Sequence, residues 1–282
     1  MSRNSSRVQA VQEPEQPEMV QTQETVRRTA NTEFVELPSG GQFYHKNHPL
    51  YKKEVVEIRY MTARDEDVLT SPTLLRKGLA LDKFIQGIIV DQNVKVDDLL
   101  IADKSAIMIA ARTTGYGPEY TIKVRCPECG TEGEHDIDLS DYPRWFIAAD
   151  ADGDNPFKKT KQGLFKATLP ISGEEIVVKL LTARDEKRIQ RTAESRSKKK
   201  LAESPTTDLL KSIVVSVGSA TDPAGISEMI MDLPARDSLF IRKNYSRLVP
   251  KVEMKEHLEC QYCGTESEME VPLEATFFWP DS

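Results

Sequence analysis

The sequence Cys-Pro-Glu-Cys-Gly-Thr-Glu at residues 126–132 recurs as Cys-Gln-Tyr-Cys-Gly-Thr-Glu at residues 260–266, which is an offset of 134. The same offset carries Trp145 onto Trp279. Chance does not keep one offset across a seven-residue motif and a distant tryptophan. The chain therefore contains an internal repeat that ends in a cysteine motif.

Two further repeats lie upstream of these motifs. Thr-Ala-Arg-Asp-Glu occurs at residues 62–66 and again at residues 182–186. A Leu-Pro turn sequence ending in Ser-Gly occurs at residues 37–40 and, with one added residue, at residues 169–173, each before a β-rich run. We therefore predict a tandem duplication of a domain-sized unit of about 110 residues.

Each unit is predicted to be α+β, with strands, then helices, then a β-hairpin that carries the cysteine motif at its tip. The Thr-Ala-Arg-Asp-Glu motifs start helices, because Thr62 and Thr182 suit the N-cap and an aspartate follows three residues later in the capping-box position. The other predicted elements are a hairpin of 34–37 with 42–44, a strand at 55–60, helices at 74–90 and 105–112, and cysteine hairpins of 120–125 with 134–139 and of 252–258 with 266–271.

These patterns divide the chain into four segments. We predict a disordered N-terminal arm at 1–32, a first repeat unit at 33–149, a linker at 150–162 and a second repeat unit at 163–282. The arm has almost no large apolar residues, and it is either a solvated tail or a segment that becomes ordered on a neighbour. The start of the linker resembles a calcium-binding loop, but it lacks the glycine and the glutamate needed at the sixth and twelfth positions.

Composition is that of a soluble globular protein and argues against several function classes. Of 282 residues, 39% are hydrophobic and 29% are charged, and the net charge is −7. This charge predicts no general attraction to nucleic acid or to anionic membranes. No apolar run is long enough to cross a bilayer, and the N-terminus lacks the basic and apolar regions of a signal peptide. The sequence has no Gly-rich phosphate loop, no G-x-S-x-G and no H-E-x-x-H, so we expect the protein not to be an enzyme.

All the cysteines of the chain lie in the two repeated motifs, as Cys126, Cys129, Cys260 and Cys263. Two C-x-x-C hairpin tips supply the four thiolates that a tetrahedral structural Zn²⁺ requires, as in a zinc ribbon. Without a secretory route the cysteines are expected to stay reduced. We predict one structural zinc held by all four cysteines, which would tie the two halves of the chain together.

Two alternatives exist for these cysteines. His135 and His257 lie near the motifs, so each half has residues to complete a local metal site, but the two histidines do not align at the offset of 134. Ligands of a duplicated site should themselves be duplicated, which disfavours the histidines. A thioredoxin-like redox role would need C-x-x-C at the start of a helix, whereas strands are predicted on both sides of each motif.

Two other segments have more than one interpretation. The offset grows from 120 to 134 between the repeats, so the second unit has 14 additional residues, which we place at 191–204. This basic stretch is predicted as an exposed helix extension or loop, with a nucleic-acid contact as the alternative. The aromatic cluster at 277–279 is predicted to pack in the core of its own, second unit, with a docking plug for a neighbouring protein as the alternative.

Several motifs of the first unit, taken together, resemble a known family. They are Leu-Pro-Ser-Gly at 37–40, Met-Thr-Ala-Arg-Asp-Glu at 61–66, Leu-Asp-Lys-Phe-Ile at 81–85, Asp103 with the apolar helix after it, Gly-Tyr-Gly at 115–117 and Cys-Pro-x-Cys-Gly at 126–130. This set is similar to the baseplate protein family of T-even-type, contractile-tailed bacteriophages, and the resemblance covers residues 33–280. The long polar arm and the basic insertion depart from it.

The resemblance implies a structural or assembly protein of the phage tail baseplate hub. Its partners would be other baseplate, hub or tail proteins, with no nucleic acid and no membrane. It would be found in the virion tail baseplate, and in the host cytoplasm during assembly. The alternative is a zinc-ribbon adaptor that binds nucleic acid, which the acidic net charge disfavours because phosphate binding needs clustered cations. A thiol oxidoreductase is the third class, and it would need an accessible disulfide and a thiolate of low pKa.

Overall fold

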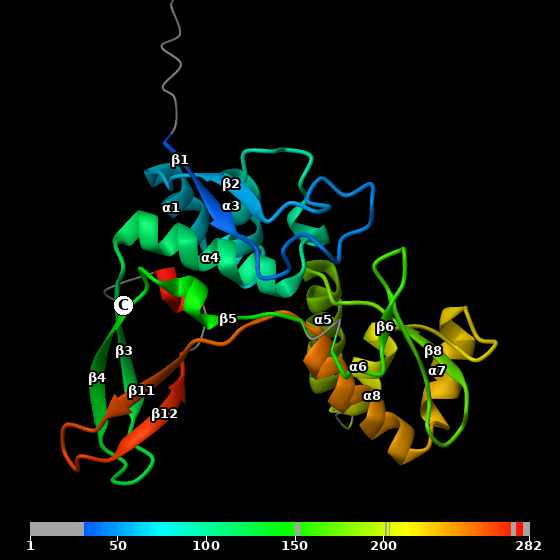
Figure 1. Cartoon of the computed structure of the whole chain (residues 1–282). Coiled ribbons are helices and arrows are strands. Elements are labelled where there is room, and N and C mark those ends of the chain that lie inside the picture. The colour runs from blue at the N-terminus through cyan, green and yellow to red at the C-terminus, as the bar shows by residue number, and fades with distance from the viewer. Residues whose placement is uncertain (1–30, 150–152, 201, 203, 272–274, 279–282) are drawn as a thin grey trace, which may run out of the picture. The chain divides into compact units, whose positions relative to one another are not determined.

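The computed structural model describes residues 31–149, 153–200, 202, 204–271 and 275–278 (Figure 1). Within these residues the fold is α+β, with eight α-helices and small antiparallel sheets, which confirms the predicted fold class at this level. The predicted arm up to residue 30, the start of the linker at 150–152 and Trp279 lie outside the described residues. None of the described helices combines the length and the apolar character needed to span a membrane.

The first part of the chain consists of a two-stranded sheet, a group of helices and a hairpin. The two strands of the sheet pair antiparallel, with Val35 opposite Val56, and both of these valines are buried. The elements are β1 (Thr32–Glu36), β2 (Val55–Arg59), α1 (Ala63–Thr70), α2 (Pro72–Arg76), α3 (Ala80–Ile88), the 3-10 turn η1 (Val96–Asp98), α4 (Ile101–Tyr116), β3 (Glu119–Arg125), β4 (Glu132–Asp138), the 3-10 turn η2 (Tyr142–Trp145) and β5 (Phe146–Ile147).

The second part contains a four-stranded antiparallel sheet in the order β6-β7-β8-β9, followed by helices and a second hairpin. Its elements are β6 (Lys158–Lys159), β7 (Phe165–Thr168), β8 (Glu175–Val178), α5 (Ala183–Lys198), α6 (Pro205–Ile213), β9 (Val214–Val217), α7 (Pro223–Met231), α8 (Ala235–Leu248), β10 (Lys251–Val252), β11 (Lys255–Glu259), β12 (Glu266–Glu270) and the 3-10 turn η3 (Ala275–Phe278).

The order of elements in the first part largely recurs in the second. Helix α8 begins 134 residues after α4, and β12 begins 134 residues after β4. The clearest differences are strand β9, which joins the second sheet, and helix α5, which has 16 residues where α1 has 8. The extra length of α5 lies in the segment 191–204, where the sequence predicts an exposed helix extension or loop, and most of its side chains are exposed.

Buried apolar side chains from both parts form one continuous core. The backbones of the two parts also meet directly where α4 and α5 begin. There the Ala183 amide donates to the Leu99 carbonyl at 2.9 Å, and Leu100 forms an antiparallel bridge with Thr182. Strands β5 and β10 pair antiparallel as a second junction. The two predicted units are therefore joined by backbone pairing as well as by side-chain packing.

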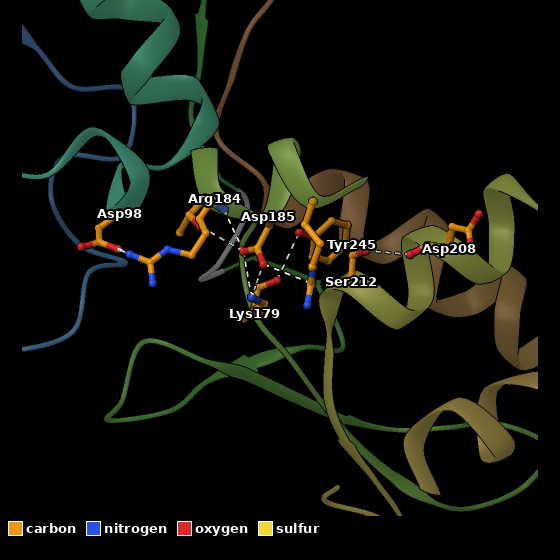
Figure 2. Close-up of polar contacts among 9 residues, drawn as sticks. Asp98, Lys179, Arg184, Asp185, Asp208, Ser212 and Tyr245 are labelled. Atoms are coloured by element: carbon orange, nitrogen blue, oxygen red, sulfur yellow. Dashed lines mark hydrogen bonds and ion pairs between the residues drawn. The ribbon is translucent and has the colours of Figure 1, made fainter. Parts of the chain in front are cut away.

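Polar contacts surround the start of α5 (Figure 2). Arg184 extends from the helix to Asp98 of the first part, with 2.6 Å between the guanidinium and the carboxylate. The neighbouring Asp185 turns to Lys179, at 2.7 Å, and accepts hydrogen bonds from the amide and hydroxyl of Thr182. Burial acts to raise the pKa of Asp185, but Lys179 and Thr182 together hold that pKa below its ordinary value. The predicted capping box is thus present at this helix, and it forms in the same way at the start of α1.

Asp103 and Asp237, which share the repeat offset, have the same structural role. Both lie in the first turn of their helix and are fully buried. The Asp103 carboxylate accepts the Ser39 amide at 3.0 Å, and Asp237 accepts the amides of Ile171 and Ser172 at 2.8 and 2.9 Å. Each aspartate therefore fixes a Leu-Pro turn onto the positive end of a helix.

The predicted hairpin of 34–37 with 42–44 is wrong, because β1 pairs with β2 and residues 42–44 lie in the connecting loop. Side-chain contacts hold this loop. The Tyr44 hydroxyl donates to Asp103 at 2.7 Å, and the Phe43 ring packs on Phe165 of β7 with 5.7 Å between centroids. The aromatic residues that suggested a strand instead bury the loop against distant parts of the chain.

The predicted helix at 74–90 is also wrong in one respect, because it is divided into α2 and α3. Gly78 has φ of +63°, and its amide donates to the Leu75 carbonyl while the Leu79 amide donates to the Leu74 carbonyl. These bonds form a Schellman motif, in which a glycine with left-handed φ ends the helix. The glycine therefore ends one helix, although the apolar pattern on both sides suggested a continuous one.

Two aromatic residues near the C-terminus are buried in the core of the first part. Their predicted burial is therefore confirmed, but the prediction that they pack in their own unit is wrong. Phe277 and Phe278 are both fully buried. Their rings meet Tyr120 and Phe84 edge to face, with centroid distances of 4.9 and 5.2 Å. The end of the second unit thus completes the core of the first.

Arg112 holds this arrangement in place, and replacing it by methionine is expected to lower the free energy of unfolding by about 3 kcal/mol. Its side chain is buried and donates to the carbonyls of Phe277, Gly117 and Glu119, at 3.1, 2.8 and 3.1 Å. Methionine keeps most of the length but leaves these three carbonyls without their donor. Urea denaturation measures the change, and Lys123→Met, at a side chain that is 77% exposed, is the control. A loss no larger than that of the control would contradict the anchoring role.

Candidate metal centre

Each cysteine motif forms the tip of an antiparallel hairpin, as predicted, and both tips have the same internal hydrogen bonds. In the first hairpin the Cys126 amide donates to the Thr131 carbonyl at 2.9 Å, and the Gly130 amide donates back to Cys126 at 3.0 Å. The equivalent bonds in the second hairpin, between Cys260 and Thr265 and back to Cys260, are 3.0 and 2.8 Å. Gly130 and Gly264 have φ angles of +71° and +68°, in the left-handed region that glycine adopts without steric cost.

The hairpins β3–β4 and β11–β12 lie side by side (Figure 1) and bring all four sulfur atoms into one cluster. Cys126 Sγ is 3.7 Å from Cys263 Sγ, and Cys129 Sγ is 3.7 Å from Cys260 Sγ. All four sulfur atoms lie within 4.8 Å of one another. A tetrahedron with zinc–sulfur bonds of about 2.3 Å has edges of about 3.8 Å. The spacing therefore fits a four-coordinate metal ion, and it is too long for a disulfide.

Hydroxyl groups next to the cysteines favour ionised sulfur. Thr131 donates to Cys129 and lowers the pKa of that thiol to about 6, and Thr265, whose Oγ1 lies 3.3 Å from Cys263 Sγ, lowers the pKa of Cys263. At Cys260 the neighbouring backbone amides act to lower the pKa, but burial and the other cysteines raise it to about 11. Four thiolates this close repel one another, so a divalent cation is the group that lets all four ionise together.

The structure also bears on the two alternatives for these cysteines. Among the described residues, the group with ligand atoms close enough to hold a metal consists of the four cysteines, without His135 or His257. His257 lies on β11 opposite Glu268, and His135 lies on β4 opposite Ile122. Each C-x-x-C connects two strands and does not begin a helix, so the setting differs from that of a thioredoxin-like motif.

Some residues of this region had no predicted role. Thr131 and Thr265 are part of the repeated motif, so their recurrence was the available signal. Arg144 pairs with Glu256 of β11 at 2.5 Å and lies over the Trp145 ring, which connects the turn η2 to the second hairpin. Nothing in the sequence near Arg144 indicated this contact, because its partner lies more than 100 residues away.

Residues 29–159 match the model of a family described as T4 bacteriophage base plate protein. No curated protein and no solved structure matched significantly. The matched segment contains the first cysteine hairpin, the buried Asp103 and the capping box of α1. Over residues 29–159, a little under half of its length, this chain is similar to the family of T4-type phage baseplate proteins.

Proposed function

We propose that this protein is a structural or assembly component of the phage tail baseplate hub, and that a structural Zn²⁺ held by Cys126, Cys129, Cys260 and Cys263 joins its two halves. The observation that carries the metal assignment is the cluster of four sulfur atoms, with two pairs 3.7 Å apart. Zinc bound there would neutralise part of the thiolate charge and hold the two hairpins at a set angle. The family match over residues 29–159 supports the baseplate role, which is non-enzymatic.

We further propose that the chain arose by tandem duplication, with a first unit at 33–149, a linker at 150–162 and a second unit at 163–282. The starts of α4 and α8, separated by the repeat offset, support this, as do the buried aspartates that each fix a Leu-Pro turn. The identical hydrogen bonds of the two hairpin tips also support it. The linker is tied to the second unit, because Phe157 is fully buried and β6 joins the sheet.

The charge of the two hairpins favours protein contacts over nucleic acid. Residues 119–138 carry six carboxylates and two cationic side chains, and residues 255–270 carry five carboxylates and one lysine. Nucleic-acid binding requires cations close to the phosphates, and the surface around the cysteines has the opposite charge. This local charge disfavours the zinc-ribbon adaptor more directly than the net charge of the whole chain does.

Affinity capture from infected cells tests this function. A tagged chain expressed during infection is expected to co-purify with tail tube, tape-measure or hub proteins, identified by mass spectrometry, after nuclease treatment. Detection of the tagged chain in purified virions would place it in the mature baseplate, and its presence only in infected lysate would indicate an assembly factor. Recovery of nucleic acid without any tail protein, in amounts that fall steeply with salt, would contradict the proposal and favour the adaptor.

A further inference from the structure

A cleft of about 510 Å³ between the loop 38–54 and the turn joining β6 to β7 has a strongly positive lining. We call it the lysine cleft, after Lys46, Lys52, Lys159 and Lys161, which line it together with one carboxylate, Glu54. The loop 38–54 has three lysines and one glutamate, and residues 155–166 have four lysines and no acidic residue. This concentration of positive charge is local, since the net charge of the chain is −7.

Most lysines of the cleft have no acidic partner. Within the described residues, no carboxylate forms an ion pair with Lys46, Lys52 or Lys161, and all three side chains are exposed. Lys52 also has φ of +58°, a strained conformation for a residue with a side chain. The cationic face of α5 is different, because Arg184, Arg188 and Arg196 each pair with an aspartate. The lysine cleft is therefore the better candidate for binding an anionic partner.

The tip of the second hairpin carries negative charge, which is complementary to the lysine cleft. Its carboxylates also lack an ion-pair partner among the described residues. Glu259 and Glu266 lie directly opposite each other on β11 and β12, and like charges in that position destabilise a hairpin. The corresponding pair of the first hairpin is Arg125 opposite Glu132, which is attractive. No described cation forms an ion pair with either Glu259 or Glu266, and both are exposed.

An exposed aromatic residue stands between these two glutamates. Tyr262 lies in the turn between the second pair of cysteines and is 68% exposed. We call Glu259, Tyr262 and Glu266 the acidic tip. Tyr44 and Tyr51 line the lysine cleft together with the lysines, so the cleft offers both ammonium groups for the carboxylates and a partly aromatic wall for a phenol ring.

We propose that the lysine cleft of one copy of this protein binds the acidic tip of a second copy. Both surfaces have unpaired charge of opposite sign, and bringing them together would relieve the repulsion between Glu259 and Glu266. Because the two surfaces are different, the contact is head to tail, and repetition of it builds a closed ring or an open chain. The inference goes beyond the proposed function, and it gives a baseplate component a way to be present in several copies.

Sedimentation velocity of the purified, zinc-loaded chain tests the proposal. Association is expected to increase with protein concentration and to weaken as NaCl is raised from about 0.05 M to about 0.5 M, because the contact is between exposed charges. The double variant Lys46→Glu, Lys161→Glu is expected to lower the association constant at least about tenfold. The matched control is Lys198→Glu, Lys199→Glu at the C-terminal end of α5, which changes net charge equally and should have less than about a twofold effect.

Mixing two variants tests the head-to-tail geometry. The cleft variant keeps its acidic tip, and a Glu259→Lys, Glu266→Lys variant keeps its lysine cleft, so neither associates alone but their mixture is expected to associate, with the two variants alternating along the assembly. A chain carrying all four charge reversals is expected to associate again. Zinc content is measured for every variant, so that loss of metal is distinguished from loss of the contact.

Three results would overturn the proposal. They are a wild-type chain that stays monomeric at low salt, an equal loss of association in the α5 control, and a mixture of the two variants that stays monomeric. The first would leave the lysine cleft for a different anionic partner and would not affect the proposed baseplate role or the metal site.

Discussion

Purified protein is expected to contain about one zinc per chain, and Cys260→Ser is expected to remove it almost completely. Each hairpin contributes only two sulfur atoms, and the two 3.7 Å pairs each join one hairpin to the other. The Cys260→Ser substitution therefore leaves two cysteines on the first hairpin and one on the second. A hairpin tip with two thiolates is too weak a site to retain the ion. Inductively coupled plasma mass spectrometry after gel filtration measures the stoichiometry.

Gln261→Ala is the matched control, because Gln261 lies in the same turn and is exposed but is not a cysteine. It is expected to keep the zinc at about one per chain. Two zinc ions per chain, or a Cys260→Ser variant with full occupancy, would show that each half binds metal alone. His135 and His257 would then be the first candidates for the additional ligands.

Infection complemented with Cys263→Ser is expected to yield at least about tenfold fewer complete contractile tails than infection complemented with the wild-type chain. Structural zinc contributes about 10 kcal/mol or more in small zinc domains, and here that free energy holds together two hairpins that are more than 100 residues apart in the sequence. Each half keeps its own sheet and helices, and the shared core remains. We therefore expect a folded chain in which the hairpins have lost their relative position.

Electron microscopy counts tails, and circular dichroism checks that the variant is folded. Gln261→Ala again serves as the control and should give a normal yield. A normal tail yield from Cys263→Ser protein shown to contain no zinc would mean that the metal is not needed for assembly. The surfaces on which assembly depends would then lie elsewhere.

Much of the local structure was predictable because it depends on residues close together in the sequence. The capping boxes of α1 and α5 need only a threonine and an aspartate three residues apart. The hairpin tips need two cysteines and a glycine at set spacing, and the structure forms both with the same hydrogen bonds. An exposed helix extension or loop at 191–204 followed from comparing the two offsets of the repeat, and the structure extends α5 into this segment.

The errors arose where tertiary contacts decide the conformation. Residues 42–44 have the composition of a strand, but Tyr44 reaches the buried Asp103 and Phe43 packs on Phe165, so the segment is a loop. The helix predicted at 74–90 has a continuous apolar pattern, and the left-handed φ of Gly78 divides it. The conformation of residues 42–44 depends on a contact with a residue more than 50 positions away. The division of the helix depends on a single backbone angle, the φ of Gly78.

The sequence by itself determined that two hairpins of similar sequence carry the four cysteines, because a repeated motif records this directly. Only the tertiary structure decided that Phe277 and Phe278 complete the core of the first part, and that lysines from residues 46–52 and 159–161 line one cleft. Those outcomes depend on how the two halves pack on each other. Packing of that kind joins residues more than 100 positions apart and leaves no periodic or spaced pattern in the chain.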